Sequence, residues 1–362
     1  RDNEEQLINA MANCGEIVNN VTQKKNEKSV LSNMSDWNPA ELIGPHPRRL
    51  SLSLFSELIT SDIWSKARGE CGYYSIRGKE LLVTIFGRPY VNTRYSFESF
   101  TPSNINNGLR KELTNYWLDK LRSNPQSHDK VEFEVACTSF PLDQKDFKDE
   151  YGGIFGKSQL QEWKNGLWKL TSNMVYLEKD SAVPKSIKRI HMLKHIFFNR
   201  SWRESCNEAI SSNNIYSQIT IIKEVLNMTK RLGTCPFSVL ARGAFIAEYM
   251  MRSLRELNIL TEDRLNHWHG SIPTITSLLT TNLIEATTTD KRNEFLYWYG
   301  HLRPSTYDIT ALDYCERRDA LFEKSELKAR NNESRVKFEL NSKEFADMNA
   351  LLHSLGLTFD AN

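Results

Sequence analysis

The feature that most constrains the fold is a helical periodicity that runs almost unbroken from about residue 158 to residue 300. Apolar residues recur at intervals of three and four over 187–198, 215–232, 238–257 and 271–288. This spacing places them along one face of a helix. A shorter pattern of the same kind covers residues 50–64. The second half of the chain is therefore expected to be a helical lobe.

The first half also contains patterns typical of β-strands. Runs rich in β-branched and aromatic residues, 81–86 and 89–95, flank Gly87 and predict a hairpin. Residues 131–135, Val-Glu-Phe-Glu-Val, alternate apolar and acidic side chains, which predicts a half-buried strand. The expected fold class is thus mainly α (α+β), with a small antiparallel sheet in the first half and a helical lobe in the second half.

The 362 residues are enough for two domains or for one domain with two lobes. We expect a lead-in helix and linker over 1–30, an α+β lobe over 31–150, a helical lobe over 151–316, and a charged connector with a terminal helix over 317–362. Pro39 is expected to open a helix that Ser35, Asp36 or Asn38 caps. Because the chain begins at Arg1, it is expected to be an excised fragment or part of a longer protein.

Composition argues against two classes of partner. Lys and Arg number 47 against 45 Asp and Glu, a net charge of +2, so no overall field attracts nucleic acid or an anionic membrane. No apolar run approaches the roughly 18 residues that a membrane-spanning helix needs. The six cysteines are dispersed and form no Cys-x-x-Cys pair, so reduced structural thiols and a cytoplasmic location are expected.

The second run of the predicted hairpin carries polar groups at alternate positions: Arg88, Tyr90, Asn92 and Arg94. In a strand, these four side chains would lie on one face. Two guanidinium groups beside an amide and a phenol suit a carboxylate or phosphate ligand. The alternative is an exposed polar sheet face without a ligand.

A second candidate segment covers 299–308, where titratable residues follow a helix and Gly300 and Pro304 indicate irregular backbone. Loops of this kind often carry function, which makes His301 and Asp308 candidate catalytic groups. The alternative is a helix-to-loop exit in which His301 only satisfies buried backbone groups.

Arg242 lies in a helical pattern made otherwise of small and apolar residues. A buried arginine needs an anionic partner, because an unpaired charge in a core costs several kcal/mol. The partner is either a ligand or an internal carboxylate such as Glu248 or Asp308.

Two other groups of titratable residues favour structural roles. His267 and His269 are two positions apart and point to different sides of a helix, so no metal site is expected there. Glu132 or Glu134 could act as a general base, but alternating glutamates more often form the solvated face of an edge strand.

Five segments, taken together, resemble a known family. Residues 35–44 (SDWNPAELIG), 87–97, 128–134, 241–245 and 299–309 (YGHLRPSTYDI) resemble, in this order, the middle region of phosphoenolpyruvate synthase-like phosphotransferases. The likeness is closest to the capsule-biosynthesis L-glutamine kinase branch and more distant to rifampin phosphotransferase. It spans roughly residues 32 to 314, and its first and last segments are the most specific.

The resemblance implies a three-part enzyme. An ATP-grasp domain cleaves ATP to AMP, a swivelling domain carries phosphate on a histidine, and a middle domain presents the acceptor. We identify neither an ATP-grasp pattern nor a phosphohistidine loop in this sequence, and His301 lies in a middle-domain motif. The resemblance therefore implies the acceptor-binding part alone, inactive by itself, with no cofactor of its own and with ATP and Mg²⁺ belonging to the parent enzyme.

The implied acceptor is a small polar molecule, such as L-glutamine or another metabolite of capsule or surface polysaccharide biosynthesis. The expected partners are this acceptor and the ATP-grasp and phosphohistidine domains, with no nucleic acid and no membrane. His301 or Asp308 would remove a proton from the acceptor. The residues expected to bind the acceptor are Arg88, Tyr90, Asn92, Arg94, Arg242, Arg303, Tyr307, Asp36 and Asn38.

Two alternatives stand beside this interpretation. The first is a non-catalytic interaction or scaffold module derived from the same family. The second is an independent helical enzyme such as a hydrolase, but the sequence lacks a nucleophile motif such as Gly-x-Ser-x-Gly.

Overall fold

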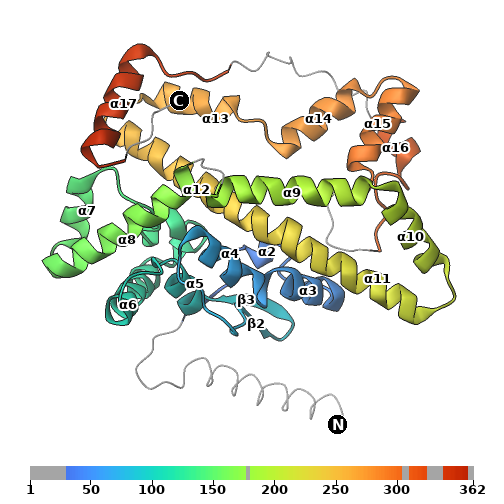
Figure 1. The fold of residues 1–362 in the computed structure, drawn as a ribbon, viewed down its shortest axis with the longest axis horizontal. Coiled ribbons are helices and arrows are strands. Elements are labelled where there is room, and N and C mark those ends of the chain that lie inside the picture. The colour runs from blue at the N-terminus through green and yellow to red at the C-terminus, as the bar shows by residue number, and fades with distance from the viewer. Residues whose placement is uncertain (1–29, 177–179, 304–309, 324–336, 358–362) are drawn as a thin grey trace, which may run out of the picture. The chain divides into compact units, whose positions relative to one another are not determined.

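The computed structural model describes residues 30–176, 180–303, 310–323 and 337–357 (Figure 1). This part of the chain is mainly helical and contains a small antiparallel sheet in its first half, which confirms the expected fold class. The chain divides into two compact units, residues 1–250 (unit 1) and residues 251–362 (unit 2). The boundary lies inside helix α12 (Cys235–Glu256) and not near residue 150.

The sheet of unit 1 consists of β1 (Leu31–Ser32), β2 (Leu82–Ile85) and β3 (Arg88–Asn92) in the order β1-β3-β2, with both pairings antiparallel. Phe86 and Gly87 connect β2 and β3 with φ angles of 49° and 75°. Two-residue hairpin turns of the most favoured kind require positive φ, which glycine adopts without steric cost. The predicted hairpin is therefore confirmed.

Helices make up most of the rest of unit 1 that the structure describes. In chain order they are α2 (Pro39–Leu42), α3 (Arg49–Phe55), α4 (Ile63–Cys71), α5 (Thr93–Ser99), α6 (Asn107–Ser123), α7 (Gln144–Tyr151), α8 (Lys157–Val175), α9 (Ala182–Phe198), α10 (Arg200–Ser211), α11 (Ile215–Met228) and the first part of α12. A 3₁₀ turn (Pro125–Asp129) and π-helical turns (Ser56–Thr60, Val131–Val135 and Thr229–Thr234) connect several of them.

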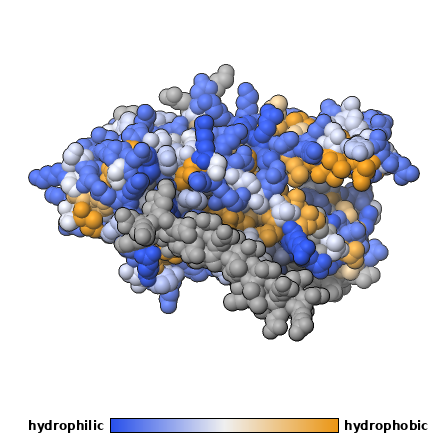
Figure 2. Space-filling model, turned by 90° about the horizontal axis from the view of Figure 1, so that it is seen from below, coloured by the Kyte–Doolittle hydropathy of each residue, from blue (hydrophilic) through white to orange (hydrophobic). Residues whose placement is uncertain are grey.

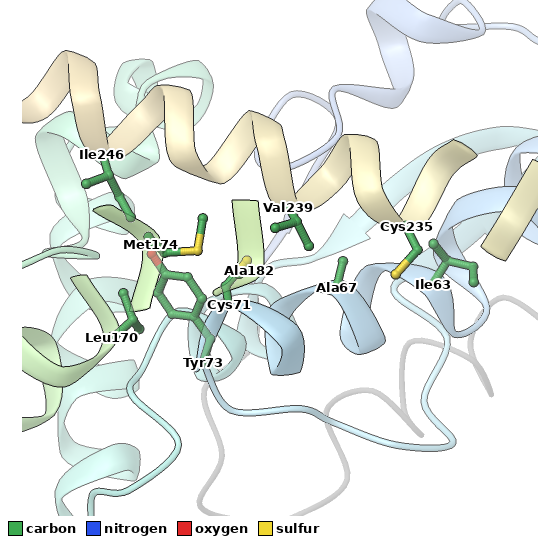
Figure 3. Close-up of a cluster of buried hydrophobic side chains, with 10 residues drawn as sticks. All are labelled: Ile63, Ala67, Cys71, Tyr73, Leu170, Met174, Ala182, Cys235, Val239 and Ile246. Atoms are coloured by element: carbon green, nitrogen blue, oxygen red, sulfur yellow. The ribbon is translucent and has the colours of Figure 1, made fainter. Parts of the chain in front are cut away.

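One hydrophobic cluster joins the first and second halves of the sequence within unit 1 (Figure 3). It packs α4 against α8, α9 and α12, and each fully buried aliphatic side chain contributes roughly 1.5–3 kcal/mol. A core shared in this way explains why no unit boundary falls at residue 150. The cluster contains Ile63, Ala67, Cys71, Tyr73, Leu170, Met174, Ala182, Cys235, Val239 and Ile246.

Three local predictions differ from the structure. Residues 131–135 form a π-helical turn and not a strand. The pattern over 50–64 is divided among α3, a π-helical turn and the start of α4. The pattern over 271–288 is two elements, because α13 (Glu262–Ser271) ends and α14 (Ile275–Glu285) begins on either side of Pro273, which cannot continue a helix without losing a hydrogen bond.

Unit 2 also contains α15 (Thr289–Tyr299), α16 (Arg318–Glu323) and α17 (Ser342–Ser354). Ala286, Phe295 and Phe322 are the buried centre of its hydrophobic cluster. Arg264 of α13 pairs with Glu344 of α17 at 2.8 Å. This ion pair links two helices that are about 80 positions apart in the sequence.

The surface carries both hydrophilic and hydrophobic areas on the face shown in Figure 2. In unit 1, α10 and α11 bury no residue, and Ile215, Ile219 and Ile222 of α11 are exposed. These two helices thus add little to the core. Within the described residues, no helix is long and apolar enough to cross a membrane.

Candidate functional site

The first part of the candidate site is a strained turn that directly precedes α2. Asp36, Trp37 and Asn38 are consecutive non-glycine residues with positive φ angles of 54°, 57° and 32°. A non-glycine residue held in such a conformation costs of order 1–3 kcal/mol and persists only where the surrounding structure fixes it. Asn38 occupies the N-cap position of α2 but makes no capping bond, and its amide donates to Glu41 Oε2 at 3.1 Å. The predicted side-chain cap from Asn38 is therefore wrong.

The turn places the carboxylate of Asp36 inside the protein. Arg68 Nη2 donates to Asp36 Oδ1 at 2.7 Å, and Ser96 Oγ donates to Oδ2 at 3.0 Å. Asp36 and Arg68 are 7% and 3% exposed. Removing one partner of a buried pair of this kind typically costs about 3–5 kcal/mol, because the other charge is left unpaired.

Among the described residues, only one of the three side-chain nitrogen atoms of Arg68 donates a hydrogen bond. The guanidinium lies over the ring of Phe100, with 4.4 Å from Cζ to the ring centroid. Its Nε and Nη1 atoms are buried and have no hydrogen-bond partner in the described part of the chain. A buried donor left unsatisfied costs about 1–3 kcal/mol, and such groups are uncommon enough in native proteins to require an explanation.

Arg242 of α12 forms the second buried ion pair. Its Nη1 donates to Glu132 Oε1 at 3.2 Å, and its Nη2 donates to Thr138 Oγ1 at 3.0 Å and to the Tyr73 hydroxyl at 3.4 Å. The expected burial of Arg242 is confirmed at 3% exposure. Within the described ranges, its Nε has no hydrogen-bond partner.

The internal carboxylate that pairs with Arg242 is Glu132, which differs from the expected candidates Glu248 and Asp308. Asp308 lies outside the described residues. Because 131–135 turn as a π-helix, Glu132 points inward with a side chain only 10% exposed, whereas Glu134 remains 45% exposed and pairs with Lys130. The expected solvated strand face is therefore wrong for Glu132.

The two ion pairs lie against the same aromatic rings. Arg68 and Arg242 are 4.4 and 5.2 Å from the centroid of Phe100, and 6.0 and 5.4 Å from that of Tyr73. Together they form one buried assembly of two arginines and two carboxyl groups. We call it the arginine cluster, and it consists of Asp36, Arg68, Tyr73, Ser96, Phe100, Glu132, Thr138 and Arg242.

Burial controls the protonation chemistry of the cluster. It raises the pKa of Glu132 above 4.5, although Arg242 opposes this shift. Burial also raises the pKa of Tyr73, whose hydroxyl donates to the Thr138 carbonyl at 2.6 Å, and raises that of neighbouring Cys71 to about 12. Neither the phenol nor the thiol can act as a base near neutral pH.

The arginine in turn is held charged. Burial lowers the pKa of Arg242, but Tyr73 and Glu132 outweigh this effect, so the pKa lies above the usual value. A permanently charged donor in a site of low dielectric constant interacts strongly with any anion that reaches it.

The predicted polar face of the hairpin is formed in part, because β3 carries Arg88, Tyr90 and Asn92 at alternate positions but not Arg94. Strand β3 ends at Asn92, whose side chain accepts a hydrogen bond from Tyr95 N at 3.3 Å and so caps α5. Arg94 therefore lies in a helix, where it donates to Asn115 at 2.8 Å and lies 3.8 Å from Glu98. Arg88 is exposed, Tyr90 is half-buried and Asn92 is buried.

The second predicted segment belongs to unit 2. His301 is exposed just after α15, and its carbonyl accepts from Arg303 Nη1 at 3.3 Å. Arg303 Nε donates to the Ala311 carbonyl at 2.8 Å, so this side chain braces its own loop. Tyr307 and Asp308 lie outside the described residues. Because the hairpin belongs to unit 1, a joint role of Arg88, Arg94 and His301 at the acceptor stays a prediction.

Sequence reasoning missed Arg68, although a signal was present. Arg68 and Arg242 each occupy the centre of an Ala-Arg-Gly tripeptide inside a helix. The glycines allow close packing: a Cβ on Gly69 would lie 3.2 Å from Ser75 Cβ, and one on Gly243 would lie 3.6 Å from Met174. An arginine between two small helical residues thus indicated burial at both sites.

One further candidate site is a pocket in unit 2. This pocket of about 150 Å³ is lined by Asn282, Glu285, Lys291, Glu294, Phe295 and Trp298, none of which the sequence singled out. Within the described part of the chain, no three His, Cys, Asp or Glu residues are arranged to hold a metal ion.

Comparison of the chain with protein-family models, with curated proteins and with solved structures finds no match.

Proposed function

We propose that the chain is the acceptor-binding part of an ATP-dependent, dikinase-type phosphotransferase. The overall reaction converts ATP, acceptor and water into AMP, inorganic phosphate and phosphorylated acceptor, through a phosphohistidine on a domain outside this chain. The acceptor is a small polar metabolite, with L-glutamine in capsule or surface polysaccharide biosynthesis as the first candidate. Within the parent enzyme, the nucleotide-binding domain and its Mg²⁺ supply the cleavage of ATP.

One observation carries this proposal. Four of the five segments that resemble the family contribute a side chain to the arginine cluster, although they are separated by up to about 200 positions in the sequence. They contribute Asp36, Ser96, Glu132 and Arg242 respectively. Motifs that meet in one buried polar assembly are typical of a site and are not required for a hydrophobic core.

The chemistry of the cluster fits an acceptor that receives a phosphoryl group. Phosphoryl transfer depends mainly on positioning and on charge stabilisation, both of which buried guanidinium groups supply. Exclusion of water would also protect a phosphohistidine from hydrolysis. In this proposal Arg242 and Asp36 orient the acceptor.

A scaffold function has one specific observation in its favour. Arg242 has an internal partner in Glu132, which is what a purely structural ion pair requires. The two candidates differ in a measurable way, because a scaffold would have no dependence of turnover on an acceptor.

The experiment is an assay of AMP formation with two preparations. The 362-residue chain alone is expected to form no AMP from ATP above a mock preparation. The protein encoded by the complete open reading frame is expected to form AMP and phosphorylated acceptor when L-glutamine or another member of a panel of small polar metabolites is present.

AMP formation by the isolated chain would contradict the assignment as an acceptor-binding part. A complete reading frame without ATP-grasp and phosphohistidine domains would favour the scaffold.

A further inference from the structure

The arginine cluster contains hydrogen-bond donors that the protein does not use. Arg68 Nε and Nη1 and Arg242 Nε are all buried and have no hydrogen-bond partner among the residues that the structure describes. Contact with Phe100 stabilises the positive charge of both arginines but offers no acceptor atom to an N–H group. Three charged donors in one assembly therefore remain unsatisfied.

The same unit shows that the fold can satisfy a buried arginine completely. Arg110 is 5% exposed and lies over the ring of Tyr74 at 3.8 Å, much as Arg68 lies over Phe100. Its Nε donates to Thr101 at 3.1 Å, its Nη1 to Asn107, and its Nη2 to the Ile105 carbonyl at 3.0 Å. Incomplete pairing at Arg68 is thus not a general property of buried arginines in this protein.

The geometry of guanidinium limits what can satisfy the free donors of Arg68. Its Nε–H and Nη1–H groups project from different edges of the planar group, so one acceptor atom cannot reach both. A carboxylate or phosphate oxygen is a strong acceptor for a charged N–H group, and one oxyanion can approach one of these two edges of Arg68.

We infer that Arg68, together with Arg242, forms a binding site for an oxyanion group, a carboxylate or a phosphate, on the molecule that this chain binds. The inference deepens the proposed function and rests on it in one respect, since the oxyanion is taken to belong to the acceptor or to the phosphoryl group delivered to it. Arg68 is then a substrate-binding residue that none of the family-like segments contains.

The test is calorimetric titration of the 362-residue chain with four probes at constant ionic strength, with sodium chloride as the reference. Sodium phosphate and sodium acetate test the two oxyanions by themselves. L-glutamine and L-glutaminamide differ only in that the amide replaces the carboxylate. Binding of L-glutamine but not of L-glutaminamide identifies the carboxylate of the acceptor, and binding of phosphate alone identifies the phosphoryl group.

The variants are Arg68→Lys and, as matched control, Arg110→Lys. Lysine keeps the positive charge beside Asp36 but lacks the additional donors, so Arg68→Lys is expected to weaken binding by about tenfold or more, the worth of a hydrogen bond to a charged group. Arg110→Lys is expected to bind as the unmodified chain does. Equal binding by Arg68→Lys and the unmodified chain would overturn the inference.

The unmodified chain provides a test that does not depend on the variants folding. Absence of saturable binding for all four probes would mean that ordered water meets the free donors, and the inference would then be wrong. Oxyanion binding without phosphotransfer in the complete enzyme would support the site and contradict only the proposed function. Phosphotransfer by the complete enzyme without oxyanion binding would support the proposed function and contradict the oxyanion site.

Discussion

Arg68 of unit 1 and Arg264 of unit 2 pair with their carboxylates in different ways. In unit 2, Arg264 donates from Nε and Nη2 to the two oxygens of Glu344, each at 2.8 Å, and its Nη1 lies 3.3 Å from His267 Nδ1. All three of its nitrogen atoms have a partner. In unit 1, Arg68 uses one nitrogen atom and leaves two buried ones unpaired.

This difference separates two uses of a buried charge. The Arg264–Glu344 pair is bidentate and joins α13 to α17, which is sufficient as a structural role. The arginine cluster has two ion pairs, a strained turn at Asp36 and free donors, and it is assembled from segments far apart in the sequence. A structural pair alone does not explain the free donors, which the proposed oxyanion would satisfy.

The largest expected effect is that of Arg242→Met. The substitution removes the charge and leaves Glu132 buried without a partner, so it should lower the free energy of unfolding by about 3–5 kcal/mol. Urea unfolding of the chain followed by circular dichroism measures this change. Arg200→Met is the control, because Arg200 is exposed and pairs only with Glu204 one turn away. It should change stability by about 0.5 kcal/mol or less.

An Arg242→Met variant as stable as the control would show that Glu132 does not depend on this arginine. The arginine cluster of unit 1 could then no longer be contrasted with the Arg264–Glu344 pair of unit 2.

A smaller effect is expected in unit 2 from Glu344→Gln. Hydrogen bonds from Arg264 lower the pKa of Glu344 below 4.5 despite burial. A lowered pKa stabilises the folded state above the unfolded pKa, and this contribution disappears as pH falls through the folded value. The unmodified chain should therefore lose the docking of α17 below about pH 4.5, and Glu344→Gln should lose about 1.5–3 kcal/mol at pH 7.

Hydrogen exchange of the α17 amides as a function of pH measures this docking. If protection in the unmodified chain is the same at pH 3 and at pH 7, the ion pair contributes nothing and the structural role assigned to Arg264 is wrong.

The smallest expected effect concerns the strained turn. Asn38→Gly removes the side chain at a φ of 32°, and should stabilise unit 1 by about 0.5 kcal/mol after the entropic cost of glycine is subtracted. Thermal unfolding measures the gain. A loss of more than about 1 kcal/mol would show that the Asn38–Glu41 hydrogen bond matters more than the strain.

The sequence predicted those parts of the fold that depend on local patterns. Helical spacing identified α9, α11 and α12, and the run around Gly87 identified the hairpin, because periodicity and turn chemistry are properties of neighbouring residues. Prediction from the sequence failed where the local structure depends on a residue far away in the chain. Residues 131–135 alternate like a strand, yet Arg242 holds Glu132 from 110 positions away.

The local pattern that predicts a buried arginine was recognised at one position of the site and missed at another. Burial of Arg242 followed from its small and apolar neighbours, and the same pattern around Arg68 was not recognised. Arg94 was misplaced because the period of two was extended through Asn92, whose side chain ends the strand and starts a helix. Which carboxylate pairs with which arginine depends on tertiary packing and could not be predicted from spacing.

The most direct test of the central claim is the KM for the acceptor, measured with the enzyme encoded by the complete reading frame and its Arg68→Lys and Arg110→Lys variants. If the arginine cluster is the acceptor site of a phosphotransferase, Arg68→Lys should raise this KM by about tenfold or more, and Arg110→Lys should leave it unchanged. Equal KM values for the two variants would contradict the account, because a fully paired buried arginine would then matter to the acceptor as much as one with free donors.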